Sequence, residues 1–197
     1  MHVYALALFA HILGVLGLFI AMGLQWLVAV RLQRAQTIGE AREWSSLIGI
    51  VGKMGPASGA LVVVAGVYMT LARWSVQAPW IVVSLGAMVV MMALGMGVTT
   101  RRMKAVHRAA LAEPEGEWIS QGLWRQINDP VLWIAAHTAG SIALGVVFLM
   151  TTKPGLSGSL LVMAVALALG VGVGAITAKR RQEPSEPAIA LEDAIHS

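Results

Sequence analysis

The chain has 197 residues, of which 57% are apolar and only 12% are charged, and its formal net charge is +4. Soluble domains carry about 25% charged residues, so this composition excludes a soluble enzyme and a disordered chain. The sequence contains no cysteine, which excludes disulfide bonds, thiolate metal sites and cysteine nucleophiles.

Five apolar stretches are long enough to form transmembrane helices, since about 20 helical residues cross the hydrocarbon core of a bilayer. Each stretch is continuous rather than alternating with a period of two, which favours helices over strands. Pro79, Pro130 and Pro154 lie near the starts of the last three. The sequence therefore predicts an all-α, polytopic bundle over residues 1–181, with spans at about 3–30, 47–74, 79–100, 131–152 and 156–178.

The basic residues predict how the bundle is oriented. Most of the 14 Lys and Arg residues fall in the first loop, the third loop and the segment after the fifth span. Because cytoplasmic loops are enriched in Lys and Arg, the N-terminus is predicted outside and the C-terminus inside a bacterial inner membrane. The lipid bilayer, and no nucleic acid, is then the expected partner of these charges. Residues 182–197, with four acids and two prolines, are predicted to form a disordered cytoplasmic tail.

The third loop contains a second type of helical signal. Ile119, Leu123 and Ile127 recur at intervals of four residues, with Trp118 and Trp124 nearby. This pattern is typical of an amphipathic helix that rests in the membrane interface.

Small residues recur at four-residue spacing within several spans, as in helices that approach one another closely in lipid. The clearest set is Ala166, Gly170 and Gly174, and shorter sets are Gly55 with Gly59, Ala10 with Gly14, and Ala136 with Gly140. Such faces serve either to pack helices within one bundle or to form a homo-oligomer, and both alternatives stay open here.

Three ionisable residues fall within predicted spans, namely His11, Lys53 and His137, whereas no Asp or Glu does. An ionisable residue inside a membrane is a functional hypothesis by default. Two histidines on different helices could hold haem or a metal ion such as copper. The alternative is that each histidine is a structural group that hydrogen-bonds within the bundle. The absence of carboxylates argues against a proton- or sodium-coupled carrier, although a small-solute or metal transporter stays an alternative.

Lys53 lies next to a helix breaker. Pro56 cannot donate a hydrogen bond to Gly52 and would kink a helix that runs through it. If the span starts near Leu47, Lys53 is buried and could form a site with His137. If the span starts at Pro56, Lys53 is an anchor that reaches the inner face, which is the interpretation that the charge distribution favours.

Methionines form a stripe on the third span, at Met88, Met92 and Met96, with Met91 alongside. Thioethers are ligands for Cu(I), so these three residues are candidate metal ligands together with His11 and His137. The alternative is that they fill irregular gaps in the core.

Short motifs give the chain a family resemblance. They are His11-Ile-Leu-Gly-Val-Leu-Gly, Ala65-Gly-Val-Tyr-Met before Arg73-Trp74 and Pro79-Trp80-Ile, and His137 followed by Lys153-Pro154. These resemble an uncharacterised family of small bacterial integral-membrane proteins. That family is in turn loosely similar to copper-resistance CopD-type proteins and to membrane haem proteins of the protoporphyrinogen oxidase type.

The resemblance implies a helical bundle with an intramembrane haem or copper function, in which His11 is the residue carried over. In the haem proteins the partner of this histidine is a lysine on a later span, whereas Lys53 stands at a different place in the pattern. No catalytic residue and no oxidase activity is carried over. Two functions are therefore expected as alternatives: a membrane protein that binds haem or a metal through His11, His137 and Lys53, or a non-catalytic subunit or scaffold.

Overall fold

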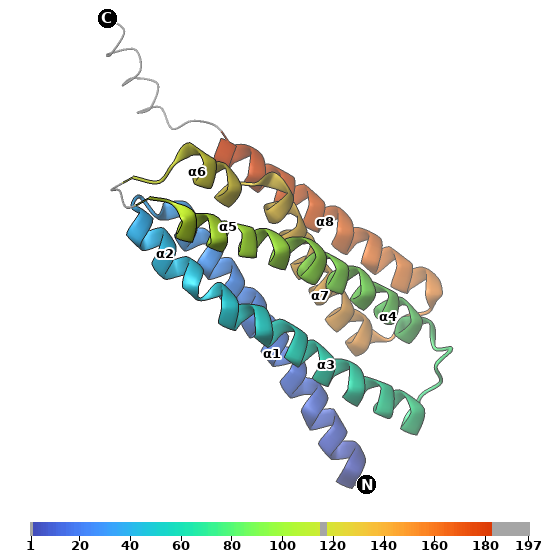
Figure 1. The fold of residues 1–197 in the computed structure, drawn as a ribbon. Coiled ribbons are helices and arrows are strands. Elements are labelled where there is room, and N and C mark those ends of the chain that lie inside the picture. Colours follow the sequence, from blue (N-terminus) through green and yellow to red (C-terminus); the bar gives the residue numbers. More distant parts are fainter. Residues whose placement is uncertain (1, 115–117, 183–197) are drawn as a thin grey trace, which may run out of the picture.

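The computed structural model describes residues 2–114 and 118–182, and these form helices joined by short connections (Figure 1). Most of the predicted tail, residues 183–197, lies outside the described residues. In chain order the elements are α1 (His2–Arg34), α2 (Ile38–Ser46), α3 (Ile48–Arg73), α4 (Pro79–Met92), the π-helix η1 (Ala93–Thr99), α5 (Thr100–Ala112), α6 (Gln121–Ile127), α7 (Pro130–Thr152) and α8 (Leu156–Gln182).

Five helical segments are long and apolar enough to cross a membrane, which confirms the predicted fold class. They run over His2–Arg34, Ile38–Arg73, Pro79–Ala112, Gln121–Thr152 and Leu156–Lys179. The helix boundaries follow the signals in the sequence: the Asp129 carboxylate accepts a hydrogen bond from the Val131 amide, with Pro130 at the first helical position. The orientation with the N-terminus outside stays a prediction.

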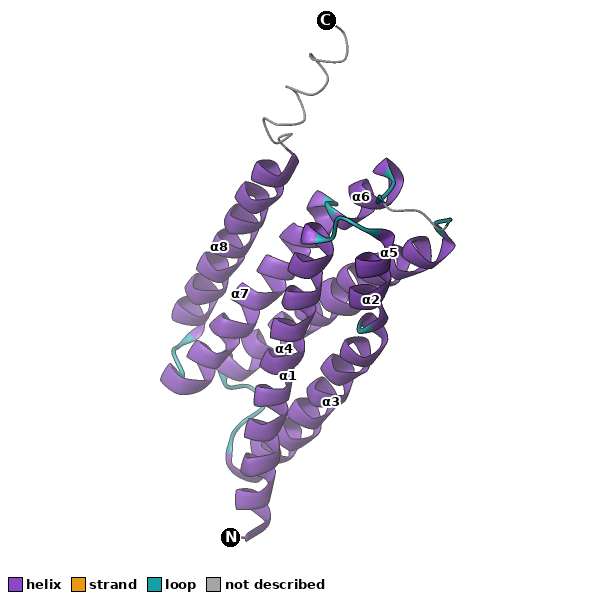
Figure 2. Ribbon diagram, turned by 90° about the vertical axis from the view of Figure 1, so that its left-hand side faces the viewer, coloured by secondary structure: helices purple, strands orange, loops and turns teal. Residues whose placement is uncertain are grey.

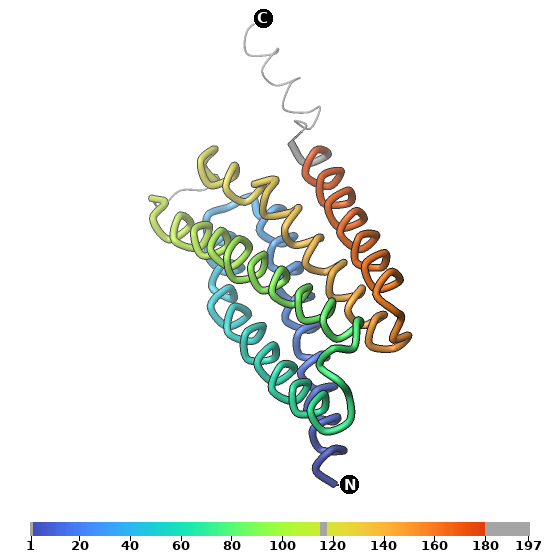
Figure 3. The backbone as a smooth tube through the Cα atoms, turned by 90° about the vertical axis from the view of Figure 1, so that its right-hand side faces the viewer, coloured from blue at the N-terminus to red at the C-terminus, as the bar shows by residue number. Residues whose placement is uncertain are grey.

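The bundle is built from two closely packed helix pairs, α1 with α3 and α7 with α8 (Figures 2 and 3). A Cβ on Gly170 of α8 would lie only 2.6 Å from the Cα of Thr138 on α7, and Gly174 approaches α7 equally closely. In the other pair, a Cβ on Gly14 would lie 3.0 Å from the carbonyl oxygen of Ser58. These glycines therefore pack helices within one chain, as one of the two alternatives predicts.

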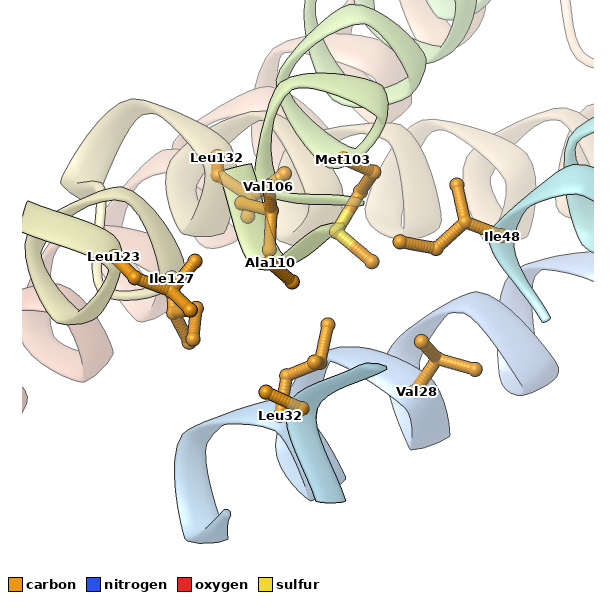
Figure 4. Packing of buried hydrophobic residues seen from close by; sticks show 10 residues of the cluster. Val28, Leu32, Ile48, Met103, Val106, Ala110, Leu123, Ile127 and Leu132 are labelled. Carbon is orange, nitrogen blue, oxygen red and sulfur yellow. The ribbon is translucent and has the colours of Figure 1, made fainter. Parts of the chain in front are cut away.

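One end of the bundle is closed by the short helices α2, α5 and α6. We call it the basic end, because α1 and α8 finish there with Arg31, Arg34 and Lys179. An apolar core joins these elements to α1, α3 and α7 (Figure 4). Its buried members are Val28, Leu32, Ala41, Ile48, Met103, Val106, Ala110, Leu123, Ile127 and Leu132.

Polar contacts reinforce the basic end. The Arg42 guanidinium of α2 donates hydrogen bonds to the carbonyl oxygens of Ala110 and Glu113, at 3.0 Å and 2.6 Å. Arg102 of α5 forms an ion pair with Asp129, which also caps α7. These contacts hold together segments that are far apart in the chain.

The structure corrects three details of the sequence-based expectation. The helix that contains the third predicted span does not end at Thr100 but continues through η1 and α5 to Ala112. The first loop contains an unpredicted helix, α2, whose N-terminus is a capping box between Thr37 and Glu40. The predicted interfacial helix is shortened to α6, which buries Leu123 and leaves Trp124 exposed.

Aromatic side chains hold the opposite end of the bundle. The Lys153 ammonium lies 4.3 Å from the ring centre of Trp74, which meets Trp80 edge to face at 5.4 Å. Lys153 itself ends α7 with a left-handed backbone. These cation–π and aromatic contacts connect the α3–α4 loop to the α7–α8 turn.

The contact between α7 and α8 yields a stability prediction. A Gly170→Val substitution places side-chain atoms against the α7 backbone, so we expect the free energy of unfolding to fall by about 2 kcal/mol or more. For a chain of this length the melting temperature in mild detergent should fall by roughly 4–8 °C. Gly172→Val is the matched control, since a Cβ at Gly172 has open space around it. Equal melting temperatures for the two variants would contradict the packing described.

Candidate functional site

The described structure contains a cavity of about 550 Å³ between α1, α3, the α4–η1–α5 helix and α7. This volume is within the usual range for sites that bind small molecules. Its lining is apolar except for the side chains of Gln25, Thr99 and Thr100. We call it the central cavity.

Glycines, which have no side chain, leave much of the space in the cavity wall. A Cβ at Gly52, Gly55 or Gly95 would meet no other atom within 4 Å, and all three glycines line the cavity. Gly55 therefore does not pack against another helix, as its spacing from Gly59 had suggested, but leaves room in the cavity wall. The wall residues Trp26, Val64, Met92 and Met96 are half or more exposed on the bundle surface. The central cavity thus opens sideways, on the flank of the bundle.

Two irregular helical segments form parts of the wall. In η1 the Thr99 hydroxyl donates to the carbonyl oxygen of Leu94 at 3.0 Å, and the amide of Thr100 donates to the carbonyl oxygen of Gly95. Single π-turns in long helices are frequent at functional sites. On α3, Pro56 lacks the amide hydrogen that would otherwise bond the carbonyl oxygen of Gly52, a residue of the apolar wall.

The central cavity gathers the predicted methionines and adds others. Met88, Met92 and Met96 all line it, together with Met91. No sequence pattern indicated the further wall residues from other segments, which come close only through the fold. These are Met22, Gln25 and Trp26 of α1, Met103 of α5 and Trp133 of α7.

The two intramembrane histidines lie elsewhere. The Nδ1 of His11 is 3.0 Å from the carbonyl oxygen of Val62 on α3, and the ring packs against Gly66. The Nδ1 of His137 is 2.8 Å from the carbonyl oxygen of Trp133, one turn earlier on α7. Neither histidine lines the central cavity. A cofactor role for His11 and His137 stays a prediction, and the carbonyl contacts are those expected of structural histidines.

Lys53 combines features of both alternatives considered for it. The helix α3 begins at Ile48 and runs through Pro56, so Lys53 lies within the helix. Its side chain is nevertheless exposed, as an anchor would be, rather than buried with His137. Lys53 stands between Gly52 and Gly55 of the cavity wall, which places it beside the central cavity.

The described residues contain no group of three or more His, Cys, Asp or Glu side chains that could hold a metal ion. The donors that the fold does bring together are the methionine thioethers of the central cavity. The lining of the central cavity is therefore suited to an apolar ligand or to a soft metal ion.

Comparison with known proteins gives one family match. The family model described as "Predicted integral membrane protein (DUF2269)" matches residues 5–154. This range contains all residues of the central cavity. Neither the curated proteins nor the solved structures gave a match to the chain.

The hydrogen bond of His11 leads to a testable expectation. His11→Ala removes the contact with Val62, so the free energy of unfolding should fall by about 0.6–1.5 kcal/mol, the range for hydrogen bonds between membrane helices. His2→Ala is the matched control, because His2 is exposed at the start of α1. Thermal unfolding in detergent measures both. A stability loss in His2→Ala as large as in His11→Ala would refute the structural role of His11.

Proposed function

The chain belongs to the family of predicted integral membrane proteins DUF2269, and we propose that it is a binding protein for an apolar molecule that dissolves in the bilayer. The binding site is the central cavity. The single observation that supports this function is an apolar hollow of about 550 Å³ that opens on the flank of a membrane-embedded bundle.

A cavity without an occupant gives up dispersion contacts along its whole wall. Bilayer components are the molecules with direct access, because exposed wall residues such as Met92 and Val64 face outward from the bundle. Methionines adapt their side chains to irregular shapes, so a wall rich in Met suits a flexible chain. Gln25 and the carbonyl of Gly52, to which Pro56 cannot donate, can position a polar group of the ligand.

Copper is a second candidate, favoured by one specific observation. Six of the 11 methionines of the chain line the central cavity: Met22, Met88, Met91, Met92, Met96 and Met103. Thioethers select Cu(I) among biological metals. A haem held by two histidines would require imidazoles on the wall, and neither His11 nor His137 lines the cavity. The cavity thus supports the copper form of the cofactor hypothesis better than a bis-histidine haem.

Photolabelling tests the binding of an apolar molecule. We expect an uncharged fatty alcohol that carries a diazirine on its chain to label Met88 and Met103, which are buried residues of the cavity wall. Ile142 and Leu149 are equally buried but lie in the core cluster that α8 shares, so they should stay unlabelled. Mass spectrometry of the full-length protein in membranes locates the label.

A cavity-filling substitution provides the control for this experiment. Gly55→Phe places a ring in the open space and should reduce labelling of Met88 and Met103 several-fold. Gly86→Phe has similar space around it but lies outside the cavity wall, so its labelling should match the unsubstituted protein. Undiminished labelling in Gly55→Phe, or labelling of Leu149, would contradict the proposal.

The copper candidate has its own test. Met88→Leu, Met92→Leu and Met96→Leu together conserve side-chain volume but remove three thioethers, so Cu(I) binding under reducing conditions should be lost. A triple substitution of Met69, Met150 and Met163 to Leu is the control, because none of these lines the cavity. Competition with a chromophoric Cu(I) chelator measures binding. Copper retained by the first variant would exclude this site.

A further inference from the structure

We propose that the occupant of the central cavity is a phospholipid with a net negative charge, whose chain fills the cavity and whose phosphate contacts Lys53 and Arg101. This inference rests on the proposed function and names the chemical class of its ligand. It is carried by the position of two cations at the edge of the cavity, where α3 and α5 come together.

Lys53 and Arg101 each follow a wall residue. Gly52, which precedes Lys53, and Thr100, which precedes Arg101, line both the central cavity and a small hollow beside it. That hollow is also lined by Met103, so α3 and α5 face each other at this level. Lys53 and Arg101 are therefore each one residue away from the cavity wall, on two helices that meet at this level.

Both side chains are available for a ligand. Lys53 and Arg101 are exposed, and neither has a hydrogen-bond or ion-pair partner among the described residues. The neighbouring Arg102 behaves differently, since it forms an ion pair with Asp129. Two adjacent helices thus present cations whose charge no described carboxylate neutralises.

Because Lys53 lies within an apolar helix, an opposite charge near its ammonium group would be stabilising. Lys53 lies five residues after the start of α3, or about 7.5 Å along the helix axis. A lysine within an apolar span extends its ammonium toward the headgroup layer. A lipid phosphate at that level provides both the opposite charge and charge-assisted hydrogen bonds for Lys and Arg. The acyl chain of the same molecule then has direct access to the cavity next to it.

The charge balance selects the headgroup. A zwitterionic phospholipid carries its own cation, which compensates its phosphate and competes with Lys53 and Arg101. An anionic headgroup such as glycerol phosphate lacks that cation. Each Lys or Arg near an anionic lipid surface contributes about a fivefold preference, so two such residues distinguish the two lipid classes clearly.

The test compares two photoreactive lipids in the full-length protein. Phosphatidylglycerol and phosphatidylcholine with the same diazirine-bearing chain are reconstituted separately with the protein in bilayer nanodiscs. Labelling is measured at the buried wall residues Met88 and Met103. We expect several-fold more labelling from phosphatidylglycerol. Lys53→Gln with Arg101→Gln should abolish that preference while labelling from phosphatidylcholine persists.

A second double variant controls for overall charge. Arg108→Gln with Lys179→Gln removes the same charge from exposed residues that do not adjoin the cavity wall. It should keep the preference for phosphatidylglycerol. Equal labelling by the two lipids, or a preference lost equally in both double variants, overturns the inference. If the uncharged alcohol still labels Met88, only the headgroup assignment fails, whereas absence of all wall labelling also removes the proposed function.

Discussion

The close backbone contact within two helix pairs is the constraint on which the rest of this structure depends. In lipid, apolar side chains gain little by meeting each other, so helices associate where small residues allow many close contacts. Gly14 provides such a contact between α1 and α3, and Gly170 and Gly174 provide it between α7 and α8. The central cavity lies between the α1–α3 pair, the long helix from α4 to α5 and α7 of the second pair, so the hollow lies where tight packing stops.

Much of the fold could be predicted from the sequence, because long apolar runs and proline or aspartate at their starts are local signals. The continuation of the third span through η1 into α5 was missed, since the basic residues after Thr100 mark the end of the apolar run but not of the helix. The role of Gly55 was also beyond the sequence. Four-residue spacing shows that a helix has a narrow face, yet only the tertiary structure decides whether a helix or a cavity lies against it.

The candidate site was predictable only in part. The Met88, Met92 and Met96 stripe follows from helical periodicity, and all three residues do face one cavity. Met22 and Met103 join them from other helices, which no local pattern could indicate. From the sequence alone, His11 and His137 were candidate ligands on the same footing as the methionines, because the sequence reports only that an imidazole lies within a span. It does not report that backbone carbonyls of Val62 and Trp133 lie beside those rings.

Because the central cavity opens on the flank of the bundle, occupancy by the proposed ligand would depend on the ligand's concentration in the bilayer. Both ends of the bundle are tied, by the α2–α5–α6 core at one end and by Lys153 with Trp74 at the other. Exchange of the proposed ligand would therefore run in the plane of the bilayer, and the relevant concentration would be its mole fraction in the lipid phase rather than a molarity in water. Dilution of the membranes in buffer leaves such occupancy unchanged, whereas an altered lipid composition shifts it directly.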